Sequence, residues 1–143
     1  MKTLTGFVIK ANGDLYFGQV PCDLKGIYDT LNCSGIEAVR IQDCIMYIDD
    51  EGKFKPDNKV NKLASILAWL NGLSPDDCIV GNAVIFGAVS PEGEMTGEDY
   101  DCPSYMGDIF MKYVGFPQEA IDAQFAFVRN AVRLAEVAER QTR

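Results

Sequence analysis

Three arginines near the end of the sequence are the residues that could most directly bind an anion. Arg129, Arg133 and Arg140 recur along a segment with helical periodicity, so their guanidinium groups lie on one side of a helix. Aligned guanidinium groups bind phosphate when they face a cleft. The alternative is a solvated helix face on which Asp122 and Glu136 neutralise the arginines.

Side chains in and after the apolar run at residues 79–89 could complete a ligand site. An aromatic ring at the end of this run could stack on a base, whereas the alternative is that the ring belongs to the core. The candidate ligand-binding residues are therefore Arg129, Arg133, Phe86, Asn82 and Tyr100.

Catalytic chemistry has few candidate residues. The sequence contains no His, which is the commonest general base and metal ligand. It also lacks a P-loop and a GxSxG motif. The cluster Asp49-Asp50-Glu51 could hold a hard cation, but it lacks the alternating ligands of a calcium loop, and a solvated hairpin turn is the alternative. We therefore expect a binding protein rather than an enzyme, with no metal and no cofactor.

The charge distribution argues against nucleic acid as a direct partner. A net charge of -8 disfavours direct binding of nucleic acid, because an acidic surface repels phosphates. Acidic residues concentrate between positions 90 and 116, where the only base is Lys112. The acids are Glu92, Glu94, Glu98, Asp99, Asp101 and Asp108. This segment could dock a basic partner or serve as a solubilising loop.

Cysteine usage and hydropathy indicate the compartment. The 5 cysteines form no CxxC pair, which favours reduced thiols over a disulfide framework or a zinc site. No signal sequence is evident, and the longest apolar run is shorter than the roughly 20 residues that span a membrane. We expect a protein of the host cytoplasm that does not enter membranes.

Apolar periodicity predicts the elements that must position these residues. Strands are predicted at residues 4–10, 15–20, 36–41, 44–48 and 79–89. Asn12-Gly13 suits a type I′ turn between the first two. Helices are predicted after the cap Asp23, at 60–70, at 104–114 and from Pro117 onwards. The pattern predicts an α+β fold, with an antiparallel sheet core, a helix between strands and C-terminal helices. We read residues 1–143 as one domain, with a β-rich core at 1–95 and a mostly helical part at 96–143.

The C-terminal helix carries two apolar rows. The first row comprises Ile121, Phe125, Val128, Val132 and Ala135. The second comprises Ala123, Phe127, Ala131, Leu134 and Ala138. Because a monomer would leave one row exposed, we expect a homo-oligomer.

Four short motifs in a fixed order resemble a family of small domains of unknown function carried by phages and other mobile elements. They are IEAV at 36–39, MYIDDEGK at 46–53, PDN at 56–58 and DCIVGNAVIFG at 77–87. The resemblance covers residues 4–95. In size and general architecture the chain is also similar to phage anti-Thoeris sponges, which are oligomers that sequester a cyclic ADP-ribose signal without degrading it.

This resemblance implies the first functional hypothesis. The protein would be a phage anti-defence protein that binds and sequesters a nucleotide-derived immune messenger of the cyclic ADP-ribose type. The arginines would engage phosphate, and Phe86 would stack on the base. The alternative is an acidic protein-binding inhibitor or nucleic-acid mimic that acts through residues 92–108. A third hypothesis is a small hydrolase or transferase that uses carboxylates.

Overall fold

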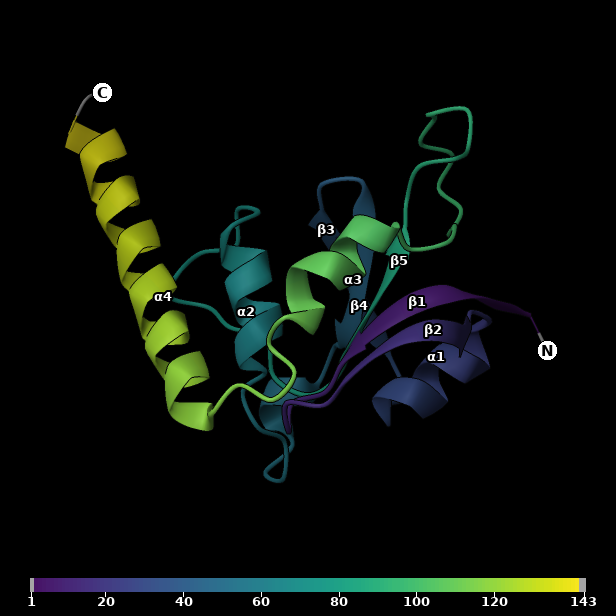
Figure 1. Cartoon of the computed structure of the whole chain (residues 1–143), viewed down its shortest axis with the longest axis horizontal. Helices are drawn as coiled ribbons and strands as arrows, with labels where there is room; N and C mark the ends of the chain where they lie inside the picture. Colours follow the sequence, from purple (N-terminus) through teal and green to yellow (C-terminus); the bar gives the residue numbers. More distant parts are fainter. Residues whose placement is uncertain (1, 142–143) are drawn as a thin grey trace.

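One five-stranded antiparallel sheet organises the structure, a computed structural model that describes residues 2–141. The strands are β1 (Thr3–Ile9), β2 (Leu15–Pro21), β3 (Ile36–Ile41), β4 (Cys44–Asp49) and β5 (Ala83–Gly87). Their order is β2-β1-β5-β4-β3, so β5 joins the β1–β2 hairpin to the β3–β4 hairpin (Figure 1). All four neighbouring pairs are antiparallel, which confirms the predicted sheet.

The central strand is shorter than predicted. β5 covers residues 83–87, and every residue in it is buried. The preceding segment leaves the sheet because Val80 forms an isolated antiparallel bridge with Val60. Gly81 adopts a φ of 89° between this bridge and β5. An apolar run of eleven residues therefore contains one strand and a separate buried connection.

The turn between β1 and β2 is not type I′, which corrects the prediction. Gly13 has a φ of 98°, whereas Asn12 is not in the positive region. Gly13 N donates to Lys10 O at 3.0 Å, so residues 11–13 form a three-residue loop that ends in glycine. The cause is local, because Asn12 Oδ1 accepts a hydrogen bond from Asp14 N at 2.9 Å.

Four α-helices complete the predicted α+β fold. They are α1 (Leu24–Leu31), α2 (Lys62–Trp69), α3 (Ser104–Met111) and α4 (Gln118–Gln141), with a short 3₁₀ helix η1 at Gly52–Phe54. Asp23 caps α1 as predicted, since its side chain accepts from Gly26 N. α2 begins two residues later than predicted, because Asn61 adopts an extended conformation and caps it.

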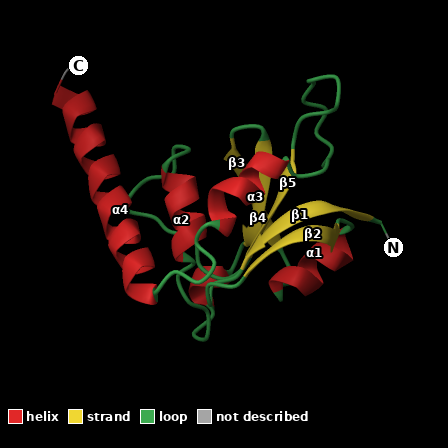
Figure 2. Ribbon diagram, in the orientation of Figure 1, coloured by secondary structure: helices red, strands yellow, loops and turns green. Residues whose placement is uncertain are grey.

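Helices cover both faces of the sheet. Strand residues alternate between two core clusters, with Phe7 and Ile9 in one and Val8 in the other. α1 packs on the Val8 face through Ile27 and Leu31. α2 and α3 cover the opposite face (Figure 2).

α4 forms an outer layer beyond α2. The ring centroids of Phe125 on α4 and Trp69 on α2 are 4.9 Å apart. Figure 1 shows α4 at the edge of the molecule, with its C-terminal half running past the end of α2. The first predicted apolar row thus faces α2, where Ile121 and Val128 are buried.

Candidate functional site

The five predicted ligand-binding residues do not come together. Asn82 directly precedes β5, whereas Tyr100 forms a bridge with Gly87 at the other end of that strand. Arg129 and Arg133 lie on α4, in the outer layer. The Tyr100 hydroxyl is within 2.5 Å of the Thr96 hydroxyl, so it braces its own loop.

Phe86 cannot stack on a ligand in this structure, which corrects the prediction. Its side chain has 0% exposure and belongs to the core cluster beneath α1. Its ring lies 6.3 Å from the ring of Tyr47. Phe86 is buried because both faces of β5 are covered by helices, a feature that depends on the whole sheet.

The arginines attach α4 to the rest of the molecule. Arg129 Nε donates to Pro75 O at 2.7 Å, and its guanidinium group lies over the Trp69 ring. Arg133 is exposed, and its Nη2 lies 3.6 Å from Oδ1 of Asp76. Neither arginine lines either of the two pockets described below. The acids named in the alternative do not pair with Arg129 or Arg133 in the described residues, since Asp122 pairs with Lys62 and Glu136 pairs with Arg140.

A lysine-lined pocket lies where the β1–β2 hairpin meets the start of α2. Its volume is about 400 Å³, and its walls are residues 10–13, residues 59–63, Gln118 and Ile121. Three of these residues are lysines, at positions 10, 59 and 62, and the described lining contains no Asp or Glu. Such a lining is unusual in a chain with 21 acidic and 13 basic residues.

Buried amide hydrogen bonds hold the two sides of this lysine pocket together. Asn61 is 1% exposed, and its Nδ2 donates to Ile9 O at 2.8 Å and to Gly81 O at 2.9 Å. Asn82 Oδ1 accepts from Ala11 N at 3.0 Å. Gly81 N donates to Lys59 O at 2.9 Å. Asn82 is therefore a positioning residue for the hairpin rather than part of the lining.

The remaining motif residues brace the segment that leads to α2. Asn58 Nδ2 donates to Gly52 O at 3.1 Å. A Cβ added to Gly52 would lie 2.6 Å from Val80 O, so only glycine fits this approach. Asp49 is buried and pairs with Lys55 at 2.5 Å, whereas Asp50 and Glu51 are exposed in a turn, as the solvated alternative for this acidic cluster expects.

The electrostatics of the lysine pocket favour an anion. Lys62 Nζ pairs with Asp122, and this hydrogen bond holds the pKa of the Asp122 carboxyl below its ordinary value. Within residues 2–141, Lys10 and Lys59 have no ion-pair partner, and both are exposed. The N-terminus of α2 opens at the same place and adds the positive end of its dipole.

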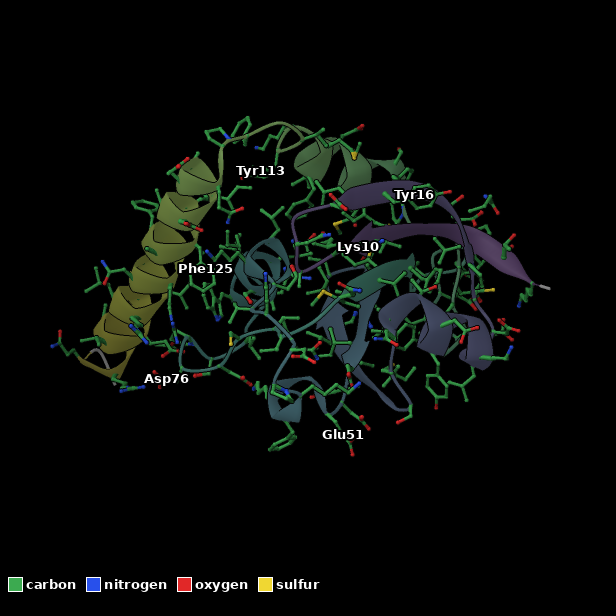
Figure 3. All side chains as sticks on the ribbon, turned by 90° about the horizontal axis from the view of Figure 1, so that it is seen from below. Lys10, Tyr16, Glu51, Asp76, Tyr113 and Phe125 are labelled. Carbon is green, nitrogen blue, oxygen red and sulfur yellow. The ribbon has the colours of Figure 1, made fainter. Side chains whose placement is uncertain are left out.

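An aromatic pocket adjoins the lysine pocket. It has a volume of about 500 Å³ and is lined by residues 12–15, residues 113–116, Gln118 and Ile121. Positions 12, 13, 118 and 121 belong to both linings, so the two pockets flank the tip of the hairpin. Tyr113 and Phe116 pack edge to face, with ring centroids 5.3 Å apart. Tyr113 lies in the connection between α3 and α4 (Figure 3).

Sequence reasoning did not identify the lysines. A partial signal exists, because Lys53, Lys55, Lys59 and Lys62 place four bases within ten positions of an acidic chain. Lys10 gives no such signal, since it lies far away in the sequence and joins the others through the contacts of Asn61 with Ile9 and of Asn82 with Ala11.

Comparison with known families places this geometry in context. The model of a domain of unknown function, DUF3846, matches residues 4–109. The chain belongs to the DUF3846 family. The DUF3846 match confirms the expected domain of unknown function and extends beyond residue 95, into α3. No curated protein and no solved structure gives a significant match.

The DUF3846 region contains all three pocket lysines and the motif residues that brace them. α4 lies outside that region, although Gln118 and Ile121 on it close the lysine pocket. Among residues 2–141, no group of three or more His, Cys, Asp or Glu side chains is arranged to hold a metal ion. None of the described helices combines the length and the apolar character of a membrane span.

Proposed function

We propose that the protein binds a small nucleotide-type anion across the lysine pocket and the aromatic pocket. The observation that carries this proposal is the convergence of Lys10, Lys59 and Lys62, without a carboxylate in the described lining, in a chain with a net charge of -8. In such a chain, a local basic pocket attracts an anion that the remaining surface repels.

In this proposal the lysine pocket binds the phosphate groups of the ligand, and the aromatic pocket binds its base. Phosphate oxygens accept hydrogen bonds from Lys10 and Lys59, whose ammonium groups have no other partner among the described residues. The base stacks against Phe116, which is 47% exposed. Asp14 also lines the aromatic pocket, and its carboxylate suits a donor group on a base and disfavours phosphate there.

The second part of the proposal is that the protein retains the bound ligand without changing it chemically. The described lining of the lysine pocket contains ammonium, amide and apolar side chains, and the carboxylate of Asp14 and the phenol of Tyr113 line the adjoining aromatic pocket, which receives the base rather than the phosphate. Such a lining supports sequestration of a nucleotide-derived immune messenger of the cyclic ADP-ribose type. In this proposal the protein is a phage anti-defence protein that acts in the host cytoplasm.

Calorimetry with cyclic ADP-ribose, ADP-ribose and inorganic pyrophosphate tests the proposal. Lys10→Ala and Lys59→Ala should each weaken binding about tenfold, the loss of one charge-assisted hydrogen bond. Lys25→Ala is the matched control, since Lys25 is an exposed lysine on α1 whose ion pair among the described residues is with Asp29. Phe116→Ala should weaken binding of the nucleotides and leave pyrophosphate unaffected.

Two results would overturn the proposal. One is the absence of binding by all three probes, and the other is wild-type affinity in the Lys10 and Lys59 variants. Mass spectrometry of the ligand released by heat separates retention from turnover. Recovery of the intact molecule supports sequestration, whereas a changed molecule indicates an enzyme.

A second candidate function rests on the acidic segment between β5 and α3. This segment projects from the end of the sheet (Figure 1), and Glu92, Glu94 and Glu98 on it are exposed. Two other acids of the segment have structural partners. Tyr47 donates its hydroxyl to Asp99 at 2.8 Å, and Thr5 N donates to Asp101 at 2.8 Å. The three glutamates are the exposed acids of the segment, although the Tyr100 hydroxyl donates a long hydrogen bond of 3.5 Å to Glu98.

The two candidates predict opposite results in an assay of anti-defence activity. If the acidic segment docks a protein, replacing Glu92, Glu94 and Glu98 together by Gln should abolish activity and leave the Lys10→Ala/Lys59→Ala variant active. If the pocket acts, the lysine variant should be inactive and the glutamine variant active. The glutamine variant retains Asp99 and Asp101, so its loop keeps both structural contacts.

A further inference from the structure

The outer face of α4 carries large apolar side chains that the rest of residues 2–141 leaves exposed. Phe127 is 70% exposed, Leu134 is 62% exposed and Val137 is 46% exposed. Phe127 and Leu134 belong to the second apolar row, with Ala123, Ala131 and Ala138 between and beside them. We call these five residues the outer row.

The packing of α4 explains why the outer row is uncovered. α4 has 24 residues and α2 has 8, which correspond to about 36 Å and about 12 Å at 1.5 Å per residue. α2 therefore contacts a fraction of α4, and it does so on the opposite side, through Phe125 and Arg129. Figures 1 and 3 both show α4 at the edge of the molecule.

Charged residues avoid the outer row. At 3.6 residues per turn, residues 120, 123, 124, 127, 130, 131, 134, 138 and 141 share one face of α4, and none is charged. The helix nevertheless contains seven charged residues, all elsewhere on its circumference. A face without charge that includes exposed Phe and Leu is typical of a helix–helix interface.

We propose that the outer row binds the outer row of a second copy of this chain, with the two α4 helices antiparallel. The spacing of the outer row, rather than charge, gives the orientation. Three charged side chains of α4 contact the same chain away from the outer row: Asp122 pairs with Lys62, Arg129 packs on Trp69 and Arg133 lies near Asp76.

The positions of the outer row fit a two-fold axis. Ala123 and Ala138 are equally far from the midpoint between residues 130 and 131, and so are Phe127 and Leu134. An antiparallel pair centred there places Phe127 opposite Leu134 of the second copy and Ala123 opposite Ala138 of the second copy. The same patch then serves both chains, as a closed dimer requires.

Light scattering coupled to size exclusion tests the dimer. The wild-type protein should have twice the mass of one chain at micromolar concentration. Phe127→Glu/Leu134→Glu should have the mass of one chain, with an unchanged circular dichroism spectrum. Phe54→Glu is the matched control, because Phe54 is 85% exposed on η1 and lies outside α4. It should remain a dimer. A wild-type monomer, or a dimer that survives both glutamates, would overturn the proposal.

A charge-rescue pair tests the orientation. Ala123→Glu should weaken the dimer at least tenfold, because it places a carboxylate in the interface. Adding Ala138→Lys should restore the dimer, since an antiparallel pair sets each new lysine beside a new glutamate of the other chain. Within one helix the two positions are about 22 Å apart, well beyond the screening length of about 8 Å at physiological salt. Failure of the lysine to restore the dimer would exclude the antiparallel arrangement.

Discussion

Arg129 lies over the indole ring of Trp69, with its guanidinium carbon 5.4 Å from the ring centroid. The same arginine donates to Pro75 O, so one side chain joins α4 both to α2 and to the loop that follows α2. Trp69 is the only tryptophan of the chain. Its fluorescence therefore reports on the docking of α4.

Arg129→Ala should lower the free energy of unfolding by about 1–3 kcal/mol, because it removes a cation–π contact and a charge-assisted hydrogen bond. Arg133→Ala should change it by less than about 0.5 kcal/mol, since the Arg133–Asp76 pair is exposed. Urea unfolding followed by Trp69 fluorescence measures both. Neither variant should alter ligand affinity. A tenfold loss of ligand affinity in Arg133→Ala would show that Arg133 contributes to ligand binding, as the sequence analysis predicted.

Asn61→Ala should be among the most destabilising single substitutions near the lysine pocket. It removes the N-cap of α2 and leaves the buried carbonyls of Ile9 and Gly81 without their donor. We expect a loss of about 2–4 kcal/mol in the free energy of unfolding, measured in urea. Asn71→Ala is the control, because the Asn71 side chain makes a single hydrogen bond among the described residues, to Leu67 O. Equal losses in the two variants would contradict this role of Asn61.

Stability should fall at acidic pH partly through Asp77. The hydrogen bond from Lys53 holds the pKa of the Asp77 carboxyl below its ordinary value. A lowered folded pKa stabilises the protein above the unfolded pKa of about 4, and this contribution disappears as the pH falls through the folded pKa. Asp77→Asn should therefore be less stable than wild type at pH 6, by up to about 1 kcal/mol for this exposed pair, and should match it at low pH.

Urea unfolding at a series of pH values measures the Asp77 effect. Asp57→Asn is the control, because Asp57 is exposed and has no partner among the described residues. Its difference from wild type should be close to zero throughout. A difference for Asp77→Asn that grows as the pH falls would have the wrong sign for this mechanism.

Thiol reactivity should divide the cysteines into two classes. Cys44 is 0% exposed and Cys102 is 4% exposed, and the contact between these two thiols raises the pKa of Cys102. Cys22, Cys33 and Cys78 are half-buried. A disulfide-exchange reagent should label those three in the native protein and the other two only after unfolding. Reductant should leave the melting temperature unchanged, and a drop of several degrees would reveal a structural disulfide.

The elements of the fold followed from local patterns. Runs of apolar and β-branched residues predicted β1, β3 and β4 to within one or two residues. Asp23 predicted the start of α1, because an N-cap side chain bonds to a backbone N–H group in the first turn of the same helix and needs no distant residue. Local patterns failed at Asn12, where an Asx contact to Asp14 replaced the expected turn.

The sites depended on contacts between distant segments. The sequence alone determined an acidic α+β domain, a helix with two apolar rows and no histidine to support the commonest chemistry. Only the tertiary structure decided that α1 covers Phe86 and that Arg129 attaches α4 to α2. It also decided which of the two apolar rows of α4 remains exposed. It also brought Lys10 to Lys59, through hydrogen bonds from Asn61 to Ile9 and Gly81 that span 52 and 20 positions. Local propensity acts over a few residues, whereas burial and pocket formation depend on which surfaces the completed sheet and helices leave uncovered.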